Sequence, residues 1–180
     1  MLDNAIETQR ALLRPIVAAD AKALHAALTW GVVRQLSRVS WPLPLCDVEN
    51  FARRAEEQTR AGVSWHHTVL VDGAPTGVMS IRPHHGAMNL GYWLAEAHWG
   101  KGLATEAAAA YVAGFFAGSS DVHLTSGAFS DNEASLRVQE KLGFVVVGEG
   151  LVESQAWGRH RPHSDTMLGR TRWREGAMAA

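Results

Sequence analysis

The chain has 180 residues, of which 47% are hydrophobic and 19% charged, a composition typical of one globular domain and unlike that of a disordered segment. Seventeen Lys and Arg against eighteen Asp and Glu give a formal net charge of -1, which favours neither nucleic acid nor an anionic membrane as a partner. Because the chain has a single cysteine and no apolar run as long as a signal peptide or a membrane span, we expect a cytoplasmic protein with one domain over residues 1–180.

The first third of the chain predicts a strand followed by two helices. Residues 10–16 (RALLRPI) mix apolar and Arg side chains like an edge strand, and the Ala-rich residues 18–28 are typical of a helix. A second helix is expected over residues 47–61, with Asp47 as its N-cap and Gly62 at its end. The stretch between these helices is expected to be irregular.

The middle of the chain predicts three antiparallel strands. Residues 67–71 (HTVLV) and 77–82 (GVMSIR) are joined by the turn residues Asp72 and Gly73, which favour a hairpin. A third strand is expected over residues 89–94 (NLGYWL), reached through a His-His-Gly turn.

The last part of the chain alternates helices and strands. An Ala-rich helix is expected over residues 101–117, and a capping-box pattern at residues 130–133 starts another helix that continues to Leu142. Further strands are expected over residues 123–128, 144–147 and 166–171. The order of elements indicates a mixed α/β domain.

One segment predicts an anion site: a strand runs through a short glycine loop into the helix at residue 101. The first N–H groups of a helix lack intrahelical acceptors and lie at its positive end, where a pyrophosphate can bind. Gly100 and Gly102 allow a close approach of the backbone, although two glycines before a helix also occur in ordinary turns. Neither the Walker pattern nor the dinucleotide pattern is present. The loop is assisted by a small side chain at Ala104, the charge of Lys101 and the hydroxyl of Thr105.

Two motifs resemble the GNAT superfamily, and within it the branch similar to the RimJ/RimL ribosomal-protein N-acetyltransferases. The branch pattern W-G-K/R-G-x-A-T-E-A is matched throughout by residues 99–107. The second signature, N-x-x-S followed by E-K-x-G-F, maps onto Asn132, Ser135, Glu140, Lys141, Gly143 and Phe144. The likeness extends over nearly the whole chain.

This resemblance implies a mostly antiparallel twisted sheet of about seven strands flanked by about four helices. It also implies acetyl-CoA as cosubstrate and no metal. The strand before the glycine loop would splay from its neighbour, pair with the pantetheine arm and polarise the thioester carbonyl. The residues that the resemblance assigns to cofactor binding are Trp93, Leu94, Trp99, Gly100, Lys101, Gly102, Leu103, Ala104, Thr105, Asn132, Ser135 and Lys141.

The family mechanism implies direct attack by the amine and two proton transfers. Many members protonate the departing thiolate with a Tyr at the position of Gln139, which is no acid, so the resemblance assigns that role to Ser135. The branch often has a Glu base at the position of Asn89, and Glu153 is the substitute that we expect. The His pairs at residues 66–67 and 84–85 could titrate, but they are expected to face solvent and lack the spacing of a zinc site.

The sequence therefore predicts an N-acetyltransferase that acts on a primary amine, either a protein N-terminal α-amine or a small molecule. The missing base favours an α-amine. The departures at Asn89 and Gln139 leave an alternative, an acyl-CoA-binding module without turnover, and a nucleotide-phosphate binder using the same loop is weaker. A homodimer is compatible with the sequence.

Overall fold

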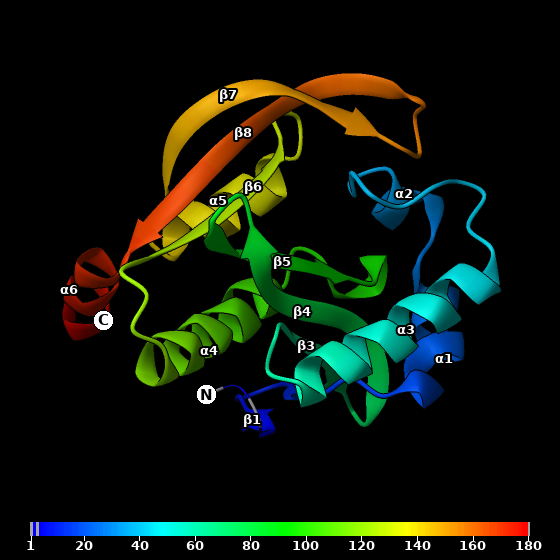
Figure 1. Ribbon diagram of the computed structural model, residues 1–180, viewed down its shortest axis with the longest axis horizontal. Coiled ribbons are helices and arrows are strands. Elements are labelled where there is room, and N and C mark those ends of the chain that lie inside the picture. The colour runs from blue at the N-terminus through cyan, green and yellow to red at the C-terminus, as the bar shows by residue number, and fades with distance from the viewer. Residues whose placement is uncertain (1, 3, 180) are drawn as a thin grey trace.

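Eight strands form one twisted sheet in the computed structural model, which describes residue 2 and residues 4–179 (Figure 1). Neighbouring strands follow the order β1-β2-β3-β4-β5-β6-β8-β7, and every pair is antiparallel except β5 and β6. The strands are β1 (Ile6–Glu7), β2 (Leu12–Pro15), β3 (Trp65–Val71), β4 (Ala74–His84), β5 (Ala87–Leu94), β6 (His123–Phe129), β7 (Val145–Ser154) and β8 (Arg159–Gly169).

Helices cover both faces of this sheet (Figure 1). Val78 of β4 packs in one apolar cluster with residues of α1 and α3, whereas its neighbour Met79 packs in the other cluster with Tyr111 and Phe115 of α4. This alternation is the period of two expected of a strand buried on both faces. The helices are α1 (Ala21–Ala27), α2 (Trp30–Val33), α3 (Leu45–Arg60), α4 (Leu103–Gly118), α5 (Glu133–Lys141) and α6 (Arg170–Ala179). Within the described ranges, no helix has the length and apolar character needed to cross a membrane.

Two short hairpins fix the register of the central strands. Asp72 and Gly73 between β3 and β4 have φ angles of 51° and 78°, and His85 and Gly86 between β4 and β5 have 48° and 79°. Two consecutive positive φ angles are typical of the type I′ turn, whose twist matches that of the strands that it joins. Both hairpins predicted from the sequence are therefore confirmed.

The mixed α/β fold is confirmed, but the predicted count of about seven strands and four helices is too low. The described residues form eight strands and six α-helices. The elements that the sequence did not predict are β1 with two residues, α2 with four, and α6, which follows β8 directly. The stretch expected to be irregular after α1 holds α2. Strand β1 and helix α2 are too short to show a periodic pattern in the sequence.

The predicted ends of four elements are corrected. The strands expected over residues 144–147 and 166–171 are two long strands, β7 and β8, which form a hairpin that arches over α5 (Figure 1). Asp47 lies in the first turn of α3, since the helix begins at Leu45. The side-chain cap of α5 is Asn132, whose Oδ1 accepts from the Ser135 N–H at 3.2 Å, and not Ser130.

Candidate active site

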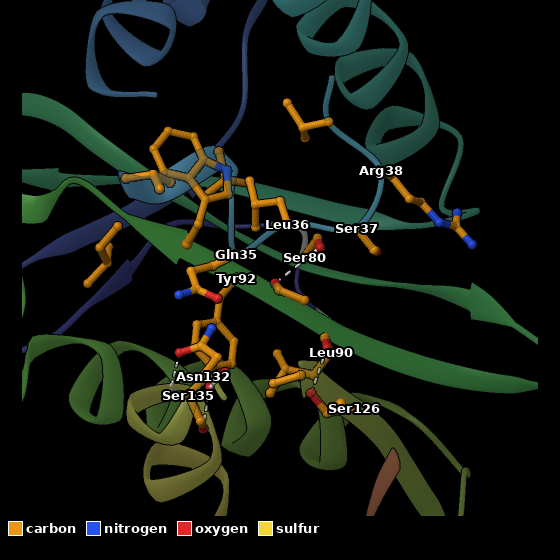
Figure 2. Close-up of a pocket in the computed structure, with 18 of the residues that line it drawn as sticks. Gln35, Leu36, Ser37, Arg38, Ser80, Leu90, Tyr92, Ser126, Asn132 and Ser135 are labelled. Carbon is orange, nitrogen blue, oxygen red and sulfur yellow. Dashed lines mark hydrogen bonds between the residues drawn. The ribbon is translucent and has the colours of Figure 1, made fainter. Parts of the chain in front are cut away.

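A cleft of about 1790 Å³ crosses the sheet where β5 and β6 separate. Its walls come from the loop before α4, the first turns of α4 and α5, strand β4, helix α3 and the segment between α2 and α3. In the close-up of Figure 2, Tyr92, Asn132 and Ser135 group together, and Leu36, Ser37 and Arg38 enter from the segment after α2. One cavity therefore joins both sequence motifs.

Strand β5 is paired with β6 at only one end. In the described part of the chain, the register of the two strands holds one pair, Asn89 with Thr125, and Leu90 O accepts from Ser126 Oγ at 3.0 Å. Peptide groups alternate in direction along a strand, so the N–H and C=O of Tyr92 face the same open side as those of Leu90. The resulting gap offers unpaired strand edge to an extended ligand.

The alternation distinguishes the two residues assigned to the pantetheine arm. Leu94 has its peptide groups on the open side, where Trp99 Nε1 donates to Leu94 O at 2.7 Å. Trp93 directly opposes Val78, and its peptide groups face β4. A contact between Trp93 and the cofactor remains a prediction. Only the side chain of Trp93, which lines the cleft, is placed to make such a contact.

The glycine loop ends in an amide cradle, defined here as the N–H groups of residues 102–105. Gly102 precedes α4 with a φ of 78°, and Gly100 has a φ of 70° with no neighbouring atom within 4 Å of the position of a Cβ. In residues 4–179, no hydrogen bond takes up the N–H groups of the amide cradle. Unpaired amides, open space and the positive end of a 16-residue helix fit a diphosphate.

Arg10 and Trp99 hold this loop in place. The Arg10 guanidinium pairs with Glu106 at 2.6 Å and donates to Lys101 O at 2.7 Å. The sequence motifs do not mark Arg10, because it lies some ninety residues before the loop that it supports. Lys101 Nζ donates to Ala97 O at 2.8 Å, and its side chain is not among those lining the cleft, although Lys141 is. The contribution that we expect from the Lys101 charge to phosphate binding remains a prediction.

The Ser135 hydroxyl lies in a network on the opposite wall. Tyr92 Oη lies 3.0 Å from Ser135 Oγ and donates to Ser135 O at 3.1 Å, and Gln139 Nε2 donates to Ser135 Oγ at 3.2 Å. Gln139 is fully buried and its Oε1 accepts from Thr166 Oγ1 at 2.5 Å, so its amide orientation is fixed. Gln139 donates to Ser135 Oγ, which therefore keeps its own proton and can direct it either to Tyr92 Oη or into the cleft.

Tyr92 is a candidate that the sequence reasoning missed. Burial raises the pKa of its phenol, which therefore stays protonated at neutral pH. The residue stands within the strand pattern NLGYWL, where an aromatic side chain is ordinary. Its significance comes from the contact of its hydroxyl with Ser135 in the first turn of α5, which no local pattern reveals.

Glu153 lies on the exposed side of β7, opposite His160, and does not line the cleft, whereas Val152 and Gln155 do. Neighbouring residues of a strand face opposite sides, so the structure does not bring Glu153 together with Ser135. Asn89, by contrast, lines the cleft and donates to Thr125 Oγ1 at 3.2 Å.

The exposure expected for the histidine pairs is wrong for His66 and His67, which are 5% and 0% exposed. Strand β3 begins at Trp65, two residues before its predicted start, and carries both rings into the interior. His84 is half-buried beside the cleft and His85 is exposed in its turn. Among the described side chains, no three His, Cys, Asp or Glu residues gather as a metal-ligand set.

His66 makes folding stability depend on pH. Burial, together with the charges of Arg82 and His67, lowers the pKa of His66 from 6.5 to about 4. Between these values the unfolded chain binds a proton that the folded chain does not, so the free energy of unfolding falls as the pH falls. We expect a loss of about 2 kcal/mol from this residue between pH 7 and pH 5. Urea unfolding at both pH values should show a smaller loss in His66→Gln than in the wild type.

The control for this measurement is His85→Asn, which changes an exposed turn residue. Between pH 7 and pH 5 this variant should lose more stability than His66→Gln does. An unchanged pH dependence in His66→Gln would contradict the assignment.

Comparisons with known proteins agree with this geometry. The family model described as an acetyltransferase (GNAT) domain matches residues 10–145. The uncharacterized N-acetyltransferase YoaA of Bacillus subtilis (strain 168) is 26% identical over 176 residues, which cover 94% of this chain and 98% of YoaA.

Solved structures share the fold. The ribosomal L7/L12 α-N-protein acetyltransferase RimL, in complex with coenzyme A, superposes with a TM-score of 0.80 at 18% identity and covers 92% of this chain and 98% of its own. RimJ of Mycobacterium smegmatis, in complex with CoA-disulfide, gives a TM-score of 0.82 at 18% identity, with 98% and 94% covered.

Proposed function

Because the chain belongs to the GNAT acetyltransferase family and is an acetyl-CoA-dependent acyltransferase, we propose that it acetylates α-amines in preference to lysine side chains. The observation that carries acetyl transfer in this cleft is the amide cradle, which opens into the same cleft as the Ser135 hydroxyl and the unpaired edge of β5. Cofactor binding and proton donation then meet in one cavity. The ribosomal α-N-protein substrate named for RimL supports a protein N-terminus, and a small-molecule α-amine fits the same chemistry.

Acetyl-CoA supplies the acetyl thioester, and the residues of the chain bind, polarise and protonate. The amide cradle binds the diphosphate, because its four N–H groups have no other acceptor among the described residues. The N–H of Tyr92 faces the gap and is the backbone donor available to polarise a carbonyl there. Ser135 Oγ holds a proton for the departing thiolate, with Gln139 and Tyr92 fixing its position.

The acceptor preference follows from the proton that the amine must lose. Asn89 occupies the expected position of a base but accepts no proton at neutral pH, and Glu153 lies outside the cleft. An amine that is already partly neutral then has the advantage. With pKa values near 8 and 10.4, about a tenth of α-amines but only about one in 2,500 lysine side chains are neutral at pH 7.

The test compares an α-amino peptide that has no lysine with an N-blocked lysine peptide, by following the release of free CoA thiol. At pH 7 we expect kcat/KM to be at least about 100-fold higher for the α-amine, and the ratio to shrink at pH 9 as lysine deprotonates. A preference for lysine at pH 7 contradicts the acceptor proposal. Calorimetric binding of acetyl-CoA without thiol release on any amine would instead support the acyl-CoA-binding module.

The proposal extends to location and assembly as expectations. Cys46 is exposed and unpaired, which fits the cytoplasm that we expect for this chain. Sedimentation velocity would show whether the chain forms a homodimer in solution. Nucleic acid is not an expected partner.

A further inference from the structure

The end of the cleft away from the amide cradle is basic. Arg82 and His84 come from β4, Arg38 from the segment between α2 and α3, and Arg54 from α3, and all four line the cleft. Arg82 and His84 are two residues apart on one strand, so they face the same side of the sheet. Arg38 NH2 lies 3.5 Å from His84 Nδ1, which ties the segment after α2 to this strand. We call these four residues the basic wall.

The basic wall begins where the gap in the sheet begins. Arg82 directly opposes Asn89, the residue of β5 that pairs with β6. Beyond it, the open edge of β5 runs through Tyr92 to Leu94, where the chain turns into the loop that precedes the amide cradle. The cleft thus has a site for a diphosphate at one end of the open edge, the basic wall at the other, and Ser135 near Tyr92 between them.

The three arginines of the basic wall have no counter-ion within the described residues. Among the described side chains, no carboxylate lies within 4.0 Å of Arg38, Arg54 or Arg82. Arg82 is half-buried, and burial together with the charge of Arg38 lowers its pKa. An unpaired cation held away from water is unfavourable unless an anion joins it.

The carboxylates that share the cleft do not fill this role. Asp165 interacts electrostatically with His84, but its Oδ1 lies 3.1 Å from His163 Nδ1. Asp131 forms an ion pair with Arg161 at 2.7 Å. Glu133 pairs with Arg137 at 3.0 Å on α5. Asp47 lines the cleft from the first turn of α3, with no arginine of the basic wall within ion-pair distance.

On the basis of the proposed acetyl transfer, we propose that the acceptor amine carries an anionic group, a carboxylate or a phosphate, which Arg38 and Arg82 bind at the basic wall. A guanidinium presents a planar fork of donors that matches both oxyanions and can bind either in two places at once. With its anionic group held there, the acceptor extends its amine along the open edge of β5 toward the gap. A polycationic amine is disfavoured by the same charges.

The experiment uses pairs of dipeptide amides that share one α-amine and differ in one side chain. Glycyl-glutamate amide is compared with glycyl-glutamine amide, and glycyl-phosphoserine amide with glycyl-serine amide. The first pair tests a carboxylate source and the second a phosphate source. We expect kcat/KM to be at least about tenfold higher for the anionic member of one pair or both, the size of effect of a lost charge-assisted hydrogen bond.

Variants of the basic wall test whether its arginines cause the preference for anionic peptides. Arg38→Gln/Arg82→Gln should bring the ratio of kcat/KM between the anionic and the neutral member of each pair to about one, and Arg82→Lys should keep part of the preference. Arg38→Gln alone, at an exposed position, should reduce it even if the double variant folds poorly. The matched control is Arg53→Gln on α3, which donates to Asn50 Oδ1 at 2.9 Å and does not line the cleft.

Two outcomes overturn the inference on its own: equal rates for anionic and neutral peptides in the wild type, or an undiminished preference in the double variant. Either result leaves the proposed acetyl transfer standing, because thiol release continues. Absence of thiol release from every peptide, with acetyl-CoA still bound in calorimetry, overturns the proposed function and this inference with it.

Discussion

An Ala104→Asp variant is expected to lose acetyl-CoA binding, with an affinity at least about 100-fold below that of the wild type and no loss of folding stability. Ala104 lies in the first turn of α4 and lines the cleft beside the amide cradle. A carboxylate there accepts hydrogen bonds from the same N–H groups that would hold the diphosphate, and it repels the charge of the diphosphate. Isothermal titration calorimetry with acetyl-CoA measures the loss.

The stability of this variant separates the effect on binding from an effect on folding. An acidic residue in the first turn of a helix is favourable by roughly 0.3–1 kcal/mol, so the melting temperature should be unchanged or raised. Ala113→Asp is the matched control, since Ala113 is exposed on the same helix and does not line the cleft. Wild-type affinity in Ala104→Asp would show that the diphosphate binds elsewhere.

The elements that position the cofactor could be predicted from the sequence because their signals are local. The unpaired amides at the start of α4 depend on a glycine loop and a long Ala-rich helix, and both are visible in residues 100–117. The cap of α5 lies two residues from the predicted Ser130, since Ser130, Asp131 and Asn132 are all capable of capping a helix.

The residues proposed for catalysis and for acceptor binding are harder to predict because their environment is set by contacts between distant elements. Glu153 is expected from its place along the chain, but the face of β7 that it occupies depends on the register of a hairpin whose two strands are longer than predicted. The β7 sequence, with Gly148 and Gly150 among exposed apolar residues, shows no clear alternation. A register difference of one residue places a side chain on the opposite face.

The basic wall illustrates the same limit at longer range. Arg38, Arg54 and Arg82 stand in three separate segments, and the net charge of -1 hides any local excess. Only the hairpin register, which puts Arg82 beside the gap, and the packing of α3 over that face bring the cations together. Local charge in a cleft therefore carries information about the acceptor that composition does not.

A Ser135→Ala variant is expected to reduce kcat by about 10²-fold or more while acetyl-CoA binds with nearly wild-type affinity. Proton transfer by a positioned side chain contributes about 10²–10⁴-fold to a rate. The change removes only the hydroxyl: the Ser135 N–H still donates to Asn132 Oδ1, so α5 keeps its cap. Steady-state rates of thiol release and calorimetry, carried out on the same preparation, measure the two quantities separately.

Conservative variants distinguish proton donation by Ser135 from a structural role in the network. Ser135→Thr keeps a hydroxyl and should retain most of the rate, whereas Tyr92→Phe leaves the Ser135 proton in place and should lower kcat less than Ser135→Ala does. Ser130→Ala is the control, because Ser130 Oγ contacts Ser164 Oγ at 3.1 Å and does not line the cleft. If Tyr92→Phe instead costs as much as Ser135→Ala, the two hydroxyls act as one unit, and the phenol of Tyr92 shares in delivering the proton to the thiolate.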